Sequence, residues 1–158
     1  EFRRVLFRSI KVNLSGASSM DVKGKAETAS FELSGASKIT INQDFGGLKL
    51  GGSGAAKIDI TGSNEYAELS FSGAVNTRMS GGSSTKILLE MSGASKFEAP
   101  DYPVKEMDIK VSGVSNVNVN VTESISVEVS GGSNIRYKGD PQIKKVDISS
   151  ISTFKKIN

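Results

Sequence analysis

The sequence has 158 residues, which is enough for one domain with a continuous buried core. It contains no Cys and no His, and this excludes disulfides, thiol nucleophiles, Cys/His metal sites and histidine acid–base catalysis. The formal net charge is +3. No apolar run approaches the roughly 20 residues that span a bilayer, so we predict no transmembrane segment.

Residues 1–9 differ from the rest of the chain. Residues 4–9 read as the translation of the end of a common sequencing adapter, and the chain opens at Glu1. We predict that residues 1–9 are an artefact joined to a truncated gene and that a signal peptide was lost upstream. The alternative is an edge strand with alternating apolar residues. Without residues 1–9 the chain is nearly neutral, which disfavours a nucleic-acid partner.

From residue 10 onward the chain repeats one four-residue motif, Ser-Gly-x-Ser, every 18 to 20 residues. Each copy opens with a Ser-Gly pair, which we read as a corner of the backbone. The pairs are Ser15 and Gly16, Ser34 and Gly35, Ser53 and Gly54, Ser72 and Gly73, Ser92 and Gly93, Ser112 and Gly113, and Ser130 and Gly131. A degenerate copy follows at residues 149–152. Glycine is expected here because a sharp bend needs dihedral angles that a Cβ obstructs.

Apolar residues occur in columns when the copies are aligned on the first Ser. They stand three and one residues before it, as Leu50 and Leu33 do, and five and seven after it, as Ile39 and Ile41 do. This period of two predicts strands with one inward face and excludes a helix. A single unit cannot bury its own apolar face, but stacked units can. The sequence therefore predicts an all-β, right-handed parallel β-helix (β-solenoid) of about eight coils.

The predicted domain covers residues 10–158. Its last ten residues, 149–158, replace the corner Gly with Ser150 and an inward apolar residue with Lys156. A further coil would stack poorly on them, so we predict a C-terminal cap.

The motifs resemble one known family. Residues 33–37, 91–95 and 129–133 carry its corner signature, and Tyr137–Pro141 matches its closing Tyr-x-Gly-Asp-Pro element. The chain resembles the GIN domain, the head domain of auto-transporter adhesins, over roughly residues 10–158. The resemblance implies an exported β-helix in the envelope of a Gram-negative bacterium (periplasmic, at the outer surface or secreted) with a role in adhesion. It supplies no catalytic residues.

Two surfaces are candidate binding sites. The first is an edge of loops carrying aromatic and acidic residues, and it comprises Phe45, Tyr66, Asp101 and Tyr102. The alternative for these aromatics is that they pack over the edge of the solenoid. Residues 99–104 are expected to be the longest loop.

The second candidate is a basic stripe four residues after the corners, formed by Lys38, Lys57 and Lys96. It suits anionic glycans or lipopolysaccharide, or else is a solvated face that discourages sideways sheet pairing. Asp59, Arg78 and Glu98 are expected to form an ion-pair ladder across coils, and no metal or other cofactor is predicted.

Three functions are compatible with these observations. The first is an adhesin-like module that binds a glycan or a surface protein without catalysis. The second is a structural scaffold that polymerises end to end, as bactofilin-type β-helices do. The third, a polysaccharide-active enzyme, needs two carboxylates flanking a bound sugar and is disfavoured by the absent His and the mixed charges. The sequence leaves the oligomeric state open.

Overall fold

The computed structural model describes residues 7–158. Phe7–Ser9 belong to the first strand and pair with Ala26 and Thr28 of a later one. Residues 1–6 lie outside the described part of the chain, so the artefact predicted for residues 1–9 stays a prediction.

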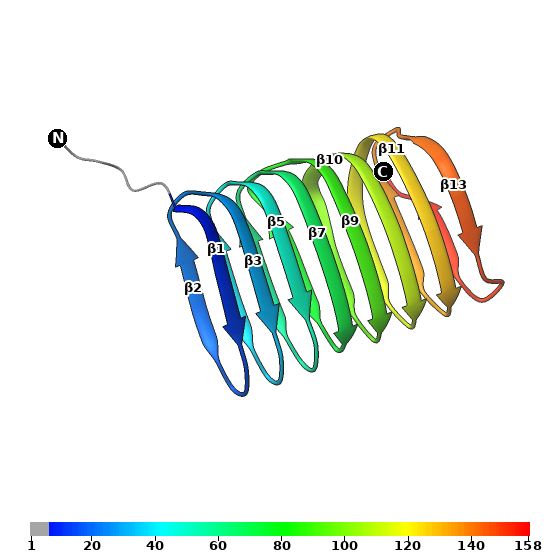
Figure 1. Cartoon of the computed structure of the whole chain (residues 1–158). Helices are drawn as coiled ribbons and strands as arrows, with labels where there is room; N and C mark the ends of the chain where they lie inside the picture. The colour runs from blue at the N-terminus through cyan, green and yellow to red at the C-terminus, as the bar shows by residue number, and fades with distance from the viewer. Residues whose placement is uncertain (1–6) are drawn as a thin grey trace.

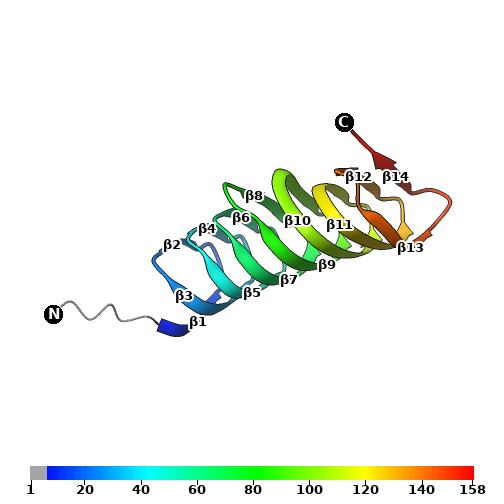
Figure 2. The ribbon, with the colours of Figure 1, turned by 90° about the horizontal axis from the view of Figure 1, so that it is seen from above.

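The chain winds into a flattened right-handed β-solenoid of about eight turns, with a front sheet and a back sheet (Figures 1 and 2). The front sheet contains β1 (Phe7–Leu14), β3 (Ala26–Leu33), β5 (Phe45–Gly52), β7 (Asn64–Gly73), β9 (Ser84–Gly93), residues 104–113 of β10, residues 121–131 of β11, and β13 (Gln142–Ile148). The back sheet contains β2 (Ser19–Lys23), β4 (Lys38–Asn42), β6 (Lys57–Thr61), β8 (Asn76–Ser80), residues 96–99 of β10, residues 116–120 of β11, β12 (Asn134–Lys138) and β14 (Thr153–Lys156).

Neighbouring coils pair in parallel, and equivalent residues of the repeat face each other. Ile39 pairs with Ile58, for example, and Leu50 pairs with Leu69. The predicted fold class is confirmed. The predicted loop at residues 99–104 is wrong, because β10 (Lys96–Gly113) is one continuous strand that passes from the back sheet to the front sheet. β11 (Asn116–Gly131) does the same one coil later.

The core lies between the two sheets and is filled by the predicted apolar columns. Phe31, Leu50 and Leu69 of one column are each at most 1% exposed. A further inward column, five residues before the corner Ser, extends the core and was missed from sequence. It contains Ala29, Leu48, Ala67, Ile87, Met107 and Ile125.

Each corner is a tight bend whose glycine touches the glycine of the preceding coil. Gly113 has a φ of 107°, and a Cβ on it would lie 2.5 Å from the carbonyl oxygen of Gly93. Both the left-handed backbone and the close approach of two backbones therefore require glycine here.

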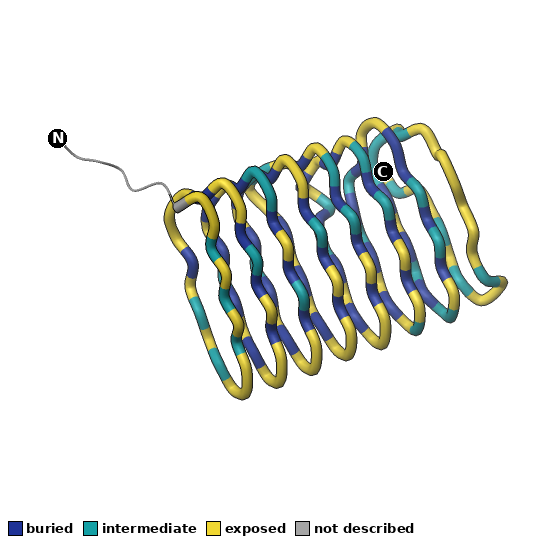
Figure 3. Tube along the Cα trace, viewed as in Figure 1, coloured by how far each residue is buried: buried dark blue, intermediate teal, exposed yellow. Residues whose placement is uncertain are grey.

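The last coil differs from the others in burial. Figure 3 shows β13 exposed along its length, whereas the preceding front strands alternate between buried and exposed residues. Val127 is fully buried, but its column neighbour Val146 is 42% exposed. Residues 149–158 form the second half of this coil, where Phe154 stacks on Tyr137 at 4.8 Å. The capping role of this segment stays a prediction.

No helix within residues 7–158 is long and apolar enough to cross a membrane.

Candidate binding groove on the front sheet

A shallow groove with a volume of about 510 Å³ runs across the front sheet beside the corners. Its lining comes from β7, β9, β10, β11 and β13, so it crosses five consecutive coils along the rod axis. Two outward columns provide its polar groups: the first Ser of each corner, and the residue two positions before that Ser.

The first column is a row of serines: Ser72, Ser92, Ser112 and Ser130. They pair in register on adjacent strands, which places them about 4.8 Å apart. All four are exposed, and none of their hydroxyls has a hydrogen-bond partner among the residues that the structure describes. The groove thus presents four free hydroxyls at a regular spacing.

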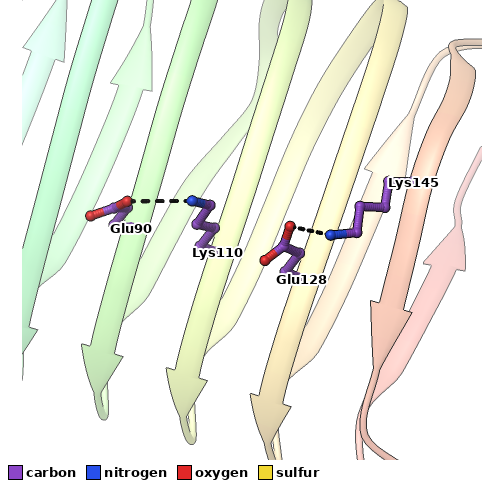
Figure 4. Close-up of polar contacts among 4 residues, drawn as sticks. All are labelled: Glu90, Lys110, Glu128 and Lys145. Atoms are coloured by element: carbon purple, nitrogen blue, oxygen red, sulfur yellow. Dashed lines mark hydrogen bonds and ion pairs between the residues drawn. The ribbon is translucent and has the colours of Figure 1, made fainter.

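The second column carries charges of both signs next to these hydroxyls. Its register runs from Glu90 through Lys110 and Glu128 to Asp147. The Glu90 carboxylate lies 4.0 Å from the Lys110 ammonium, and the Glu128 carboxylate accepts a hydrogen bond of 2.6 Å from Lys145 (Figure 4). The lining therefore offers both acceptors and a cation to a polar ligand.

Lys145 also controls the ionisation of one groove carboxylate. Its hydrogen bond, and secondly its positive charge, hold the pKa of Glu128 below the usual value for a glutamate. The same contacts with Glu128 raise the pKa of Lys145. Both side chains are in solvent, so water and salt screen their attraction. Glu128 is an ionised acceptor at neutral pH.

The last Ser of the same corners faces the interior instead. Ser95, Ser115 and Ser133 are at most 3% exposed. The Ser115 hydroxyl accepts from the Ser95 N–H at 3.2 Å and donates to the Gly93 carbonyl at 3.4 Å. Ser133 repeats this arrangement one coil later. This inner column joins adjacent coils and is not available to a ligand.

The structure separates the four residues predicted at the loop edge. Phe45 is 4% exposed and Tyr102 is fully buried, whereas Tyr66 is 38% exposed and Asp101 is exposed. Phe45 and Tyr102 are therefore packed against the solenoid, as the alternative expected, and a ligand site at Tyr66 and Asp101 stays a prediction. Tyr66 lies on β7, and Asp101 lies 3.9 Å from Lys138 of the back sheet.

Tyr102 is buried because its phenol is satisfied by neighbouring coils. The hydroxyl donates to the Ser83 carbonyl at 2.9 Å, lies 2.9 Å from the Ser84 hydroxyl and accepts from the Asn64 amide at 3.2 Å. Burial raises the pKa of Tyr102. A buried tyrosine hydroxyl needs hydrogen-bond partners, and these three residues provide them. The position of Tyr102 is therefore explained by packing and hydrogen bonding inside the solenoid.

The residues of the predicted basic stripe lie on the back sheet and are exposed. Lys38 and Lys57 pair in register, whereas Lys96 forms an ion pair of 2.7 Å with Glu98. The predicted ladder is present in part: Arg78 lies 3.8 Å from Glu98, but no ion pair joins Asp59 to Arg78 in the described chain.

The front groove was missed from sequence, although its residues belong to columns visible in the repeat. The available signal was that Ser72, Ser92, Ser112 and Ser130 share one outward position with charged residues two places before them.

The fold and the groove define a class: an elongated β-solenoid with an extended groove across its front sheet. The sequence model of one family, described as "Putative auto-transporter adhesin, head GIN domain", matches residues 8–141. The chain belongs to this family, as the resemblance predicted. No sequence among the curated proteins matches it.

One solved structure is similar in fold. It is a crystal structure of a protein from Parabacteroides distasonis described as a putative lipid binding protein, with a TM-score of 0.75 and 16% sequence identity. The match covers 94% of this chain and 61% of that protein. This chain therefore spans less than two thirds of its neighbour, and the similarity shows the fold alone.

Proposed function

We propose that this domain is a non-catalytic, adhesin-like binding module of the bacterial cell envelope, and that it holds a glycan chain in the front groove. The observation that carries the proposal is the row of four free hydroxyls beside a column of charges. Membership of an adhesin head family supports a binding role. The export expected for the family fits an encounter with surface polysaccharides.

The chemistry of the groove suits a sugar chain. A glycan presents hydroxyl donors and acceptors at regular intervals along its length, and the groove presents the same kinds of group once per coil. The groove serines lie on paired strands that fix their backbone, so little conformational entropy is lost when a ligand binds. Many weak contacts along one line would then add up to useful affinity.

The fold neighbour's description raises lipid as a second ligand class. Phe71, Met91, Val111 and Val129 also line the groove, but each is at most 6% exposed. The exposed groups of the lining are hydroxyls and charges, which suit a sugar or a polar headgroup better than an acyl chain. Glycan is therefore the ligand class to test first.

A matched pair of double variants tests the groove. Ser92→Ala with Ser112→Ala removes two hydroxyls inside the groove. Ser34→Ala with Ser53→Ala removes two hydroxyls of the same column outside the groove. We expect the first pair to weaken binding to a glycan array hit about tenfold, since each hydrogen bond contributes about 0.5–1.5 kcal/mol. The second pair should stay within about twofold. Equal binding by both variants would move the site elsewhere, and a folded domain that binds no glycan would refute the proposal.

A second candidate function is the end-to-end scaffold, favoured by the exposed apolar side chains of the last coil. Ile143, Val146 and Ile148 of β13 are 48%, 42% and 38% exposed, and β13 pairs on one edge only within the described chain. Unpaired apolar strand edges promote association. Sedimentation velocity over a hundredfold range of concentration distinguishes the two functions, because a scaffold forms growing filaments and a binding module remains discrete.

A further inference from the structure

The two sheets of the solenoid differ in charge. The back sheet carries nine cations and three acids, whereas the front sheet carries eight cations and ten acids. The back-sheet cations are Lys23, Lys38, Lys57, Arg78, Lys96, Arg136, Lys138, Lys155 and Lys156, and its acids are Asp21, Asp59 and Glu98. The excess positive charge of the domain is therefore concentrated on one face.

The register of the back sheet sets like charges side by side at two places, although Arg78 pairs with the acids Asp59 and Glu98. Lys38 pairs with Lys57, and Arg136 pairs with Lys155. Like charges directly opposite each other on paired strands are destabilising. None of these four side chains has an ion-pair partner within residues 7–158. Water and salt screen this repulsion in the free domain, and an anion that approaches from outside relieves it further.

The front sheet shows that the fold does not impose this pattern. There the register mostly sets opposite charges side by side, as in the pairs of Lys49 with Glu68 and of Glu90 with Lys110, although Glu128 pairs with Asp147. The same strand spacing and the same repeat thus leave the front sheet nearly balanced in charge and the back sheet with an excess of cations.

The cations of the back sheet are spread over a plane rather than along a line. Eight of the nine lie at three outward positions of the repeat, represented by Lys38, Arg136 and Lys138, and they occur on every back-sheet strand except residues 116–120 of β11. The ninth, Lys156, pairs with the inward Tyr137. Figure 2 shows the back strands forming one layer along the whole rod. No large apolar side chain is exposed on these strands within the described residues. A flat field of cations without apolar anchors matches a planar anionic surface, because a single polymer chain would need only one row.

We propose that the back sheet docks flat on an anionic phospholipid surface, by charge alone and without insertion. The front groove then faces away from the lipid and is free to hold its own ligand. The contact is reversible, since a basic face without apolar anchors is held by electrostatic attraction that salt screens.

Vesicle sedimentation tests the proposal with the full chain. The vesicles contain phosphatidylcholine with 0% or about 30% phosphatidylglycerol. We expect binding only to the anionic vesicles at low salt, falling as salt rises. The variant Lys38→Gln, Lys57→Gln, Arg136→Gln should bind about 100-fold more weakly, at about fivefold per cation. The control Lys49→Gln, Lys105→Gln, Lys144→Gln removes three exposed cations from the front sheet and should lose less than fivefold.

Three results overturn the proposal. The first is no binding to anionic vesicles at low salt by a folded domain. The second is an equal loss in the two triple variants, which would reduce the effect to net charge. The third is tight, back-sheet-dependent binding of soluble polyphosphate without vesicle binding, which would make the partner a polymer. None of these results bears on glycan binding in the front groove, which the serine variants test separately.

Discussion

The two serines of one corner stand three residues apart and meet opposite environments. Ser112 faces the front groove and has a free hydroxyl, whereas Ser115 of the same corner is 1% exposed and bonds to the preceding coil. The residues are chemically identical, and the bend at Gly113 between them sends one side chain outward and the other inward. A single short motif therefore supplies both a hydrogen bond between coils and an exposed hydroxyl of the proposed binding groove.

The difference in burial gives the two serines of each motif different roles. A buried hydroxyl that bonds an N–H and a carbonyl of the neighbouring coil contributes to stability, because that N–H has no other partner among the described residues. An exposed hydroxyl gains nothing from folding, since water satisfies it equally well. Stability should therefore depend on the inner half of the corner, and binding on the outer half.

The largest expected effect is on the bend itself. Gly113→Ala places a Cβ 2.5 Å from the Gly93 carbonyl in a left-handed backbone, so we expect a loss of more than about 2 kcal/mol of unfolding free energy. Gly16→Ala is the matched control, because Gly16 also has a positive φ but a Cβ there meets nothing within 4 Å. It should cost about 1 kcal/mol. Equal losses in urea unfolding would show that coil-to-coil contact is unimportant.

The next effect separates the two serine columns. Ser115→Ala removes the partner of the Ser95 N–H, while the Gly93 carbonyl keeps its bond from the Val114 N–H, and the change should cost about 1–3 kcal/mol. Ser112→Ala should change stability by less than about 0.5 kcal/mol. Urea unfolding of both variants measures the difference directly. Equal stabilities would mean that the inner hydroxyl bonds contribute no more than hydration does.

The repeat was predictable from sequence because its columns depend only on spacing and hydrophobicity. Leu50, Ile58 and Leu69 are recognisable as core residues on those grounds alone, and their burial follows from strand alternation. The inner serine column was harder to recognise because two coils depart from it. Ala56 and Val75 stand where other coils have Ser. Gly52 has no side chain, and a Cβ on it would lie 3.4 Å from a methyl group of Val75. The larger Val75 side chain therefore helps to fill the space beside Gly52.

The candidate sites were less predictable, for physical reasons. Phe45 and Tyr102 looked like loop aromatics, but β10 continues as a strand through Tyr102 and carries that side chain inward to Asn64 and Ser84. The sequence alone does not show that Asn64 and Ser84, from other coils, lie where they can hydrogen-bond to the buried phenol. The charge difference between the sheets was equally hidden, because it emerges only when all outward positions of one face are collected.

The smallest effect concerns a charge on the outer side of the corner. Lys145 lowers the pKa of Glu128, so any stability from this pair is present above the unfolded pKa of the carboxyl and is lost as the pH falls through the lower, folded pKa. Lys145→Gln should raise the pKa of Glu128 toward its usual value, as NMR titration of its side-chain carboxyl would show. The urea midpoint at neutral pH should be unchanged, because both groups are in solvent. An unchanged pKa would mean that the ion pair of Figure 4 does not persist in solution. A shifted pKa with an unchanged midpoint would mean that this ion pair sets the charge of the groove without stabilising the fold. The pair would then resemble the outer serines, whereas the inner serines contribute to the stability of the coils.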